Sequence, residues 1–276
     1  MPKVQSVLCF LAFPRMAALF LLCFFSYSLQ AQVDNSSKFG PSSQIRFSAM
    51  PALYNKQDYV NVGRPLYKSS AGVGGEFVVS YGQSLWKGFG ISAGFGIGLV
   101  PYNYSFDLVT DSSSVIAGNP GTLGQKPSKN GVLLYTFPVL IEKKILLSPL
   151  DKLFLNLEAG IKWNINPNAS HTFGGSYWAQ TPGGEDVRYF QYRYTYATSE
   201  TEFVSYVFKA GLLKVNNRGN SFSWNMVLQH SPATILTGTY QFNDLGFTSF
   251  GTTSLHNNYI GLEFIFGLTL DKKSNR

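Results

Sequence analysis

The stretch Gly88–Leu99, GFGISAGFGIGL, alternates strictly between apolar and small residues. Side chains change face at every residue of a β-strand, so this stretch predicts a strand with one apolar face and one nearly bare face. Glycine packs nothing and weakens a strand, but on the inner wall of a small closed barrel it leaves room for long side chains reaching across from the opposite wall. The pattern therefore indicates a barrel whose apolar face meets lipid.

The same alternation recurs in Lys152–Ile165, Ser221–Gln229 and Asn258–Leu270. In the first of these, a face of leucine, isoleucine and tryptophan alternates with a face that carries Glu158 and Lys162. Alternation of apolar and polar residues over about ten positions is typical of a transmembrane β-strand.

Eight strands follow from the alternation and from the turn residues between segments. They are Gln44–Tyr54, Gly72–Gly82, Gly88–Pro101, Gly131–Lys143, Lys152–Ile165, Phe203–Val215, Ser221–Gln229 and Leu255–Leu270. Long and short connections alternate between them, as an up-and-down barrel with tight periplasmic turns requires. The predicted fold class is all-β, an eight-stranded antiparallel up-and-down transmembrane β-barrel. Ten strands are the alternative, because Val187–Ala197 and part of Leu236–Phe250 also alternate; we interpret these two as hairpins that continue above the membrane.

The N-terminal residues have the features of a secretory signal peptide. Lys3 and Arg15 supply positive charge, Met16–Tyr27 is apolar, and Ala31 is a small residue at the expected cleavage position. We therefore expect a signal peptide at 1–31, a periplasmic segment at 32–43, the barrel at 44–270 and a polar tail at 271–276.

Composition excludes several other classes of protein. Only 13% of the 276 residues are charged, against about 25% in soluble proteins. No run of about 18 uncharged apolar residues occurs in the mature region, so a helical membrane span is excluded there. The basic residues behind the net charge of +7 are scattered along the chain. They form no basic stripe with interleaved aromatics, so the sequence does not predict a nucleic-acid partner.

Seven charged residues fall on the face opposite the apolar set of their strands. They are Arg46, Glu76, Glu142, Glu158, Lys162, Lys209 and Glu263. Buried charges are stable when they are paired, so these four acids and three bases predict a hydrogen-bonded network of ion pairs in the lumen. An eight-stranded barrel is only wide enough for its own side chains. We expect a closed lumen, with a narrow porin-like channel for ions or small solutes as the alternative.

Aromatic residues occupy two kinds of position. Trp86 and Trp224 near the short turns, and Trp163, Tyr54, Tyr102 and Tyr104 near the long-loop ends, predict interfacial girdles. The long connection Asn166–Glu202 is rich in aromatics, which are frequent binding anchors on rigid hairpins. Its binding candidates are Tyr177, Trp178, Tyr189, Tyr192 and Tyr194. The alternative is a loop cap packed on itself.

The residues give little support to catalysis or to a metal site. Both cysteines, Cys9 and Cys23, lie in the expected signal peptide, and the three histidines lack metal-ligand spacing. His230 and Ser231 do not match the pattern of lipid-modifying barrels, because the two residues fall on opposite faces and the expected His-x-Ser spacing is absent. We expect no enzyme activity, no cofactor and no metal.

Three segments carry a resemblance to a known family. Tyr135–Lys143, Leu155–Lys162 and Tyr259–Leu270 resemble strands of the small outer-membrane β-barrel family common in the Bacteroidetes, often described as porin-family or outer-membrane-protein β-barrel domains. The resemblance implies an outer-membrane barrel and brings no catalytic residues; some relatives are similar to a small barrel required for type IX secretion. The chain departs from many barrels by ending in Asp271–Arg276, so the barrel-assembly machinery would have to recognise Phe264 and Phe266 internally.

The sequence thus predicts a non-catalytic outer-membrane barrel with a side-chain-filled lumen and long extracellular loops. Its expected partners are outer-membrane lipid, the barrel-assembly machinery, and an envelope or extracellular protein or glycan at the loops, including a role in an envelope or secretion complex. A soluble lipocalin-like barrel with the two faces reversed remains open, because parity defines two faces without saying which is inside.

Overall fold

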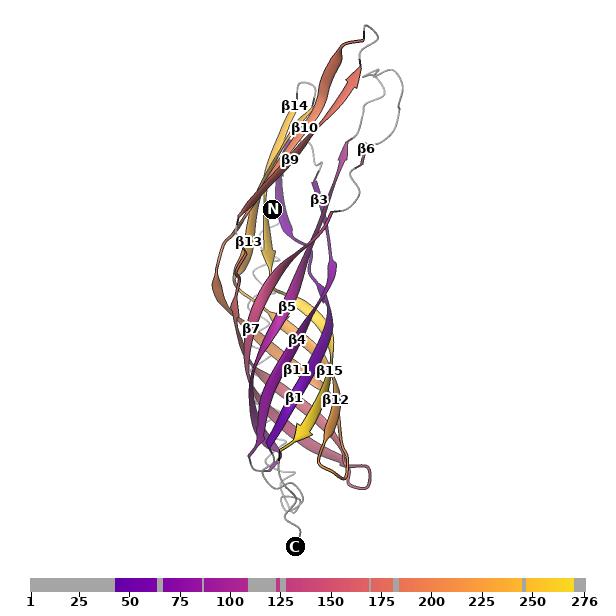
Figure 1. The fold of residues 1–276 in the computed structure, drawn as a ribbon, viewed down its shortest axis with the longest axis vertical. Helices are drawn as coiled ribbons and strands as arrows, with labels where there is room; N and C mark the ends of the chain where they lie inside the picture. The colour runs from indigo at the N-terminus through magenta and orange to yellow at the C-terminus, as the bar shows by residue number, and fades with distance from the viewer. Residues whose placement is uncertain are drawn as a thin grey trace, which may run out of the picture.

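The computed structural model describes residues 43–63, 67–85, 87–108, 123–124, 128–168, 170–180, 184–244 and 247–270. The predicted signal peptide, periplasmic segment and polar tail lie outside these ranges, apart from Ser43, and stay predictions. The described elements are β-strands that form a barrel and an elongated extension above it (Figure 1). Among the described residues, no helix is long and apolar enough to cross a membrane.

Eight antiparallel strands close the barrel. They are β1 (Ser43–Tyr54), β4 (Gly72–Ser84), β5 (Phe89–Leu108), β7 (Ser128–Ser148), β8 (Leu153–Ile165), β11 (Glu202–Val215), β12 (Ser221–His230) and β15 (Tyr259–Thr269). Their order is β5-β4-β1-β15-β12-β11-β8-β7, and β7 pairs with β5 to complete the circle. The predicted eight-stranded barrel is confirmed, and the ten-stranded alternative is wrong.

The short connections lie at one end of the barrel, where β1 begins and β15 ends. In the β11–β12 turn, the Asn216 side chain accepts hydrogen bonds from the backbone amides of Arg218 and Asn220, and Gly219 has a φ of 88°. This conformation favours glycine, and asparagine and glycine are both typical turn residues.

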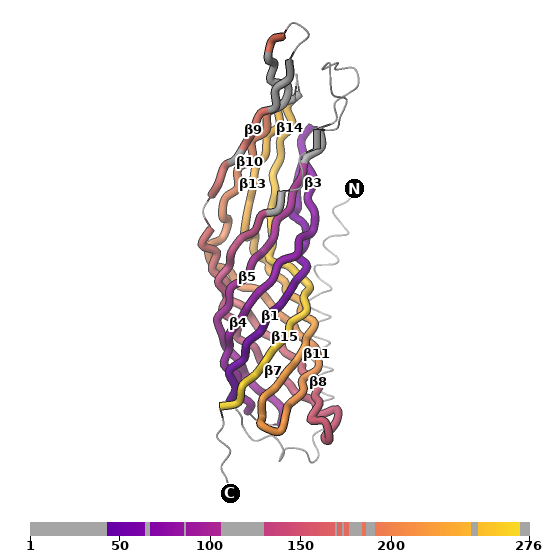
Figure 2. Tube along the Cα trace, turned by 45° about the vertical axis from the view of Figure 1, so that its right-hand side comes forward, coloured from indigo at the N-terminus to yellow at the C-terminus, as the bar shows by residue number. Residues whose placement is uncertain are grey.

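The other strands build the extension at the opposite end. They are β2 (Asp58–Val62), β3 (Tyr67–Ser70), β6 (Leu123–Gly124), β9 (His171–Gln180), β10 (Asp186–Thr198), β13 (Thr234–Asp244) and β14 (Phe247–His256). Five of them form one sheet in the order β2-β14-β13-β10-β9, while β3 and β6 pair with the upper part of β5. Figure 2 shows this sheet rising from the barrel wall.

Two sequence expectations change at this junction. The hairpins expected at Val187–Ala197 and Leu236–Phe250 do continue beyond the barrel, but they join each other and β2 in a single sheet. The strand expected at Leu255–Leu270 is interrupted at Asn257 and Asn258, and its first residues belong to β14. Pairing of β14 with β13 and β2 therefore defines a separate element.

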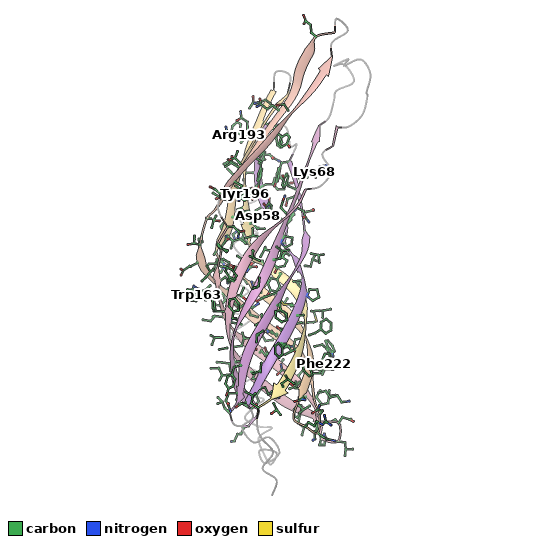
Figure 3. All side chains as sticks on the ribbon, in the orientation of Figure 1. Asp58, Lys68, Trp163, Arg193, Tyr196 and Phe222 are labelled. Atoms are coloured by element: carbon green, nitrogen blue, oxygen red, sulfur yellow. The ribbon has the colours of Figure 1, made fainter. Side chains whose placement is uncertain are left out.

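The two faces of the barrel wall differ sharply. Large apolar side chains cover the outside; Trp163 and Phe222, for example, are 43% and 51% exposed and project outward (Figure 3). Along β15 the pattern alternates without interruption from Tyr259 to Leu268. The apolar residues face away from the lumen, as the sequence predicts for a barrel in lipid.

The expected aromatic girdle is partly wrong. Tyr54, Tyr102 and Tyr104 point inward and are nearly fully buried, because they share the parity of the inward residues of β1 and β5. Trp163 and Trp224 do lie on the outer face, and Trp86 lies outside the described residues. Proximity to a strand end was therefore a poorer guide than parity.

Candidate functional site

The structure gathers all seven sequence-predicted lumen charges inside the barrel, each at most 7% exposed. They come from β1, β4, β7, β8, β11 and β15, so most of the wall contributes. Their ion pairs form three clusters, which we call the lower, middle and upper clusters in order from the short-turn end.

The lower cluster is centred on Glu142. Arg46 donates two hydrogen bonds to its carboxylate, at 2.7 and 3.0 Å, and Lys144 lies 3.1 Å from the same carboxylate. A planar guanidinium matches a carboxylate in this two-bond geometry, which makes the pair strong and directional. Glu142 is 1% exposed, so its charge depends on these two cations.

Two glycines allow Arg46 and Glu142 to meet. These residues stand on β1 and β7, with β4 and β5 between them. A Cβ atom on Gly82 of β4 would lie 2.5 Å from the guanidinium carbon of Arg46, and one on Gly90 of β5 would lie 2.3 Å from a Glu142 carboxylate oxygen. The glycines on the inner face of β4 and β5 therefore leave room for side chains that extend across them from the strands on either side. For these two glycines this corrects the expectation of side chains reaching from the opposite wall.

The middle cluster joins Lys209 to two carboxylates. Its ammonium lies 2.8 Å from Glu263 and 3.4 Å from Glu158. Asn156 donates a 2.8 Å hydrogen bond to Glu158, and Asn225 donates a longer one, 3.4 Å, to Glu263. Glu158 also stands opposite Glu142 in the β7–β8 register, and like charges there are tolerable because each has its own cation.

The upper cluster pairs Lys162 with Glu76. Lys162 also donates a hydrogen bond to the Tyr259 hydroxyl at 2.8 Å, and that hydroxyl donates to Glu76 at 3.1 Å. Thr136 donates a further 2.7 Å hydrogen bond to the same carboxylate. A buried ion pair is stable only when such additional hydrogen bonds satisfy its remaining donors and acceptors.

Sequence reasoning missed Lys144 and Tyr259 as members of the network. Lys144 shares the inward parity of Glu142, so extending the expected strand beyond Lys143 would have found it. With Lys144 the described lumen charges balance at four acids and four bases. A cavity bordered by the middle cluster has a volume of about 20 Å³, which holds about one water molecule.

The glycines of the lower cluster give a direct test of this packing. We expect Gly90→Ala and Gly82→Ala each to lower the free energy of unfolding by about 1–3 kcal/mol, because the added methyl group overpacks the Arg46–Glu142 pair. Gly98→Ala is the matched control on the same inward face, since the nearest atom to its Cβ would be 3.7 Å away. Urea unfolding in detergent micelles measures all three, and equal losses at Gly90 and Gly98 would contradict the packing.

In the extension, the five-stranded sheet faces β3 and the upper part of β5. The rings of Tyr67, Tyr104, Tyr194 and Tyr240 pack between them and are called the tyrosine core below. The ring of Tyr67 on β3 stacks on Tyr240 of β13 at 4.7 Å and lies 6.1 Å from Tyr194 of β10, both nearly parallel. The Tyr67 hydroxyl donates a 2.6 Å hydrogen bond to Gln57. Burial raises the pKa of Tyr240 to about 12 and raises that of Tyr67 as well, so both hydroxyls stay neutral at physiological pH.

Two of the binding candidates, Tyr192 and Tyr194, lie on the side of β10 that faces the tyrosine core. Tyr194 is 3% exposed inside the tyrosine core and is not available as an exposed anchor, while Tyr192 is half-buried on the same side of β10. Tyr177 and Trp178 on β9 and Tyr189 on β10 have side chains outside the described set.

Of the two residues considered for catalysis, Ser231 directly follows β12. The Ser231 hydroxyl is buried and, among the described residues, has no hydrogen-bond partner. Within the same part of the chain, no three His, Cys, Asp or Glu side chains gather in a way that could hold a metal ion.

Comparisons with known proteins give structural likenesses only. No protein-family model and no curated protein matches the sequence. The outer membrane protein OprG from Pseudomonas aeruginosa is similar at 8% identity, over 84% of this chain and 98% of that chain, with a TM-score of 0.44. The outer membrane protease OmpT from Escherichia coli is similar at 13% identity, over 87% and 99%, with a TM-score of 0.35. The resemblance to the Bacteroidetes barrels stays a prediction.

Proposed function

We propose that the chain is a closed, non-catalytic outer-membrane barrel that carries its extension as a platform for binding a partner. Its apolar outer face is suited to lipid, and its charges are paired inside. The short-turn end would face the periplasm and the extension would stand outside the cell, as in barrels of this kind. A cleaved signal peptide and insertion by the barrel-assembly machinery belong to the same proposal, as do roles in an envelope or secretion complex.

The observation that carries the proposal is the filled lumen. Eight paired charges and their hydrogen-bonding neighbours occupy it, and a cavity found among them has room for about one water molecule. A conducting pore needs a continuous aqueous path, and barrels of this strand number are filled by their own side chains. With the lumen occupied, the extension is the part of the molecule suited to a partner.

Planar-bilayer recording tests the closed lumen. We expect purified, refolded protein to insert without producing steady single-channel steps in symmetric potassium chloride, while a general porin recorded in the same bilayers produces them. Reproducible steps that scale with salt concentration would contradict the proposal and favour the narrow channel.

A further inference from the structure

The strand β9 lies at one edge of the five-stranded sheet of the extension. It pairs with β10 from His171 to Gln180, and among the described residues no strand lies on its other side. Every second residue of an edge strand turns its backbone N–H and C=O groups away from the sheet, which makes a template for another strand.

This edge lacks the proline and the charged residues that commonly prevent pairing. Its ten residues, HTFGGSYWAQ, contain no proline and no Asp, Glu, Lys or Arg. The opposite edge of the same sheet, β2, is only five residues long and begins with Asp58. By contrast, a backbone group of the neighbouring strand β7 does have a partner: the Leu133 carbonyl accepts a 2.8 Å hydrogen bond from the Asn168 side chain. Natural proteins normally protect long edges, so a ten-residue edge strand without such protective residues is a candidate for binding another strand.

A shallow groove runs along the β9–β10 hairpin. Its volume is about 320 Å³, and it is lined by Thr172, Gly174, Gly175, Ser176, Gln191, Tyr192 and Arg193. A volume equal to about ten water molecules accommodates a short stretch of peptide. Glycine within a strand marks a place where another backbone can approach closely, and Gly174 gives such access on the outer face.

Arg193 gives the groove its charge preference. It is exposed on the extension (Figure 3) and stands directly opposite Gly174 in the β9–β10 register. Strands lie about 4.8 Å apart, so a strand added at β9 would be two spacings from Arg193, with only the bare Gly174 between. An arginine side chain can cross such a glycine, as Arg46 does beside Gly82.

We propose that the β9 edge binds an extended segment of another protein as an added β-strand, with an Asp or Glu of that segment opposite Gly174 and paired with Arg193. Main-chain hydrogen bonds supply affinity in this mode, and side chains at alternate positions supply specificity. The inference names the partner class for the proposed platform and rests on that function.

A second copy of the chain does not fit this edge. Copies inserted in one membrane share the same orientation, so their β9 strands run in the same direction, and the slant of β9 to the long axis (Figure 1) makes two copies cross. Antiparallel pairing needs a strand that runs the opposite way. A free extended segment satisfies this requirement.

Selection from a displayed library of random 12-residue peptides, against the full protein in lipid nanodiscs, tests the inference. We expect enriched peptides that carry Asp or Glu, and we expect Arg193→Gln to weaken their binding at least tenfold. Arg218→Gln, an exposed arginine in the β11–β12 turn at the far end, is the matched control and should leave binding unchanged. Bound peptide should slow amide hydrogen exchange across residues 171–180.

Any of these peptide results would overturn it: no enrichment above an empty nanodisc, protection that falls outside β9, or equal binding by the wild type and Arg193→Gln. A protein that dimerises through β9 in sedimentation experiments would also overturn it, in favour of a second copy. Bilayer conductance reports on the barrel and β9 exchange reports on the edge, so failure of the proposed function and failure of this inference are distinguishable.

Discussion

Replacing Glu142 by glutamine is expected to lower the free energy of unfolding by about 3–5 kcal/mol. The substitution keeps the size of the side chain but removes the charge that holds Arg46 in two hydrogen bonds and Lys144 at 3.1 Å. Arg46 would then be buried without its partner, and the partly buried Lys144 would lose its counter-charge, which is the costly way to break a buried ion pair. Urea unfolding in detergent micelles, followed by tryptophan fluorescence, measures the loss.

The neighbouring Ile141 gives the control, because it is 62% exposed on the outer face. Ile141→Leu should change stability by less than about 1.5 kcal/mol. The double variant Arg46→Met, Glu142→Leu should recover part of the loss, since it removes both partners of the strongest pair. A loss below about 1 kcal/mol for Glu142→Gln would mean that the lower cluster is hydrated and that the lumen is more open than its packing indicates.

A charge on the outer face should be nearly as damaging as a charge left alone inside. Phe264 stands at the centre of the apolar series on the outer face of β15, with Ile260, Leu262, Phe266 and Leu268 on either side. We expect Phe264→Arg to cost about 2–4 kcal/mol in lipid vesicles, because arginine at the bilayer midplane loses its hydration. Urea unfolding of protein inserted in vesicles measures the effect.

The matched control is Thr252→Arg on the exposed face of β14 in the extension. It should change stability by no more than about 0.5 kcal/mol, as surface substitutions usually do. If both arginines are tolerated equally, the face around Phe264 meets water, and the barrel would be of the soluble kind with its faces reversed.

The alternation of residues along each strand predicted most of the barrel, because it separates inward-facing from outward-facing side chains. It placed Arg46, Lys162 and Glu263 on the inner wall and Phe264 on the outer wall, because a closed barrel has one inside and a strand has a period of two. Lys144 was missed as a lumen residue only because the expected strand ended one residue before it, at Lys143. Tyr54 was misplaced because a position near a strand end predicts the direction of a side chain less well than the parity that Tyr54 shares with Arg46.

The extension could not be predicted in the same way. Local alternation in Val187–Ala197 indicated a strand, but the pairing of β10 with β13 and of β14 with β2 joins segments far apart in the sequence. Such registers depend on which loops meet in space, and no local pattern encodes this. The tyrosine core follows from these pairings, so Tyr194 could not be assigned to the inside before the sheet was known.

Electrophoresis of the outer-membrane fraction, unheated and heated, tests the central claim most directly. A lipid-facing barrel with a network of ion pairs inside resists detergent, so the account predicts a band in that fraction that migrates faster unheated than heated. A protein found in the soluble fraction, with no shift on heating, would contradict the account and would place the apolar face of the barrel inside.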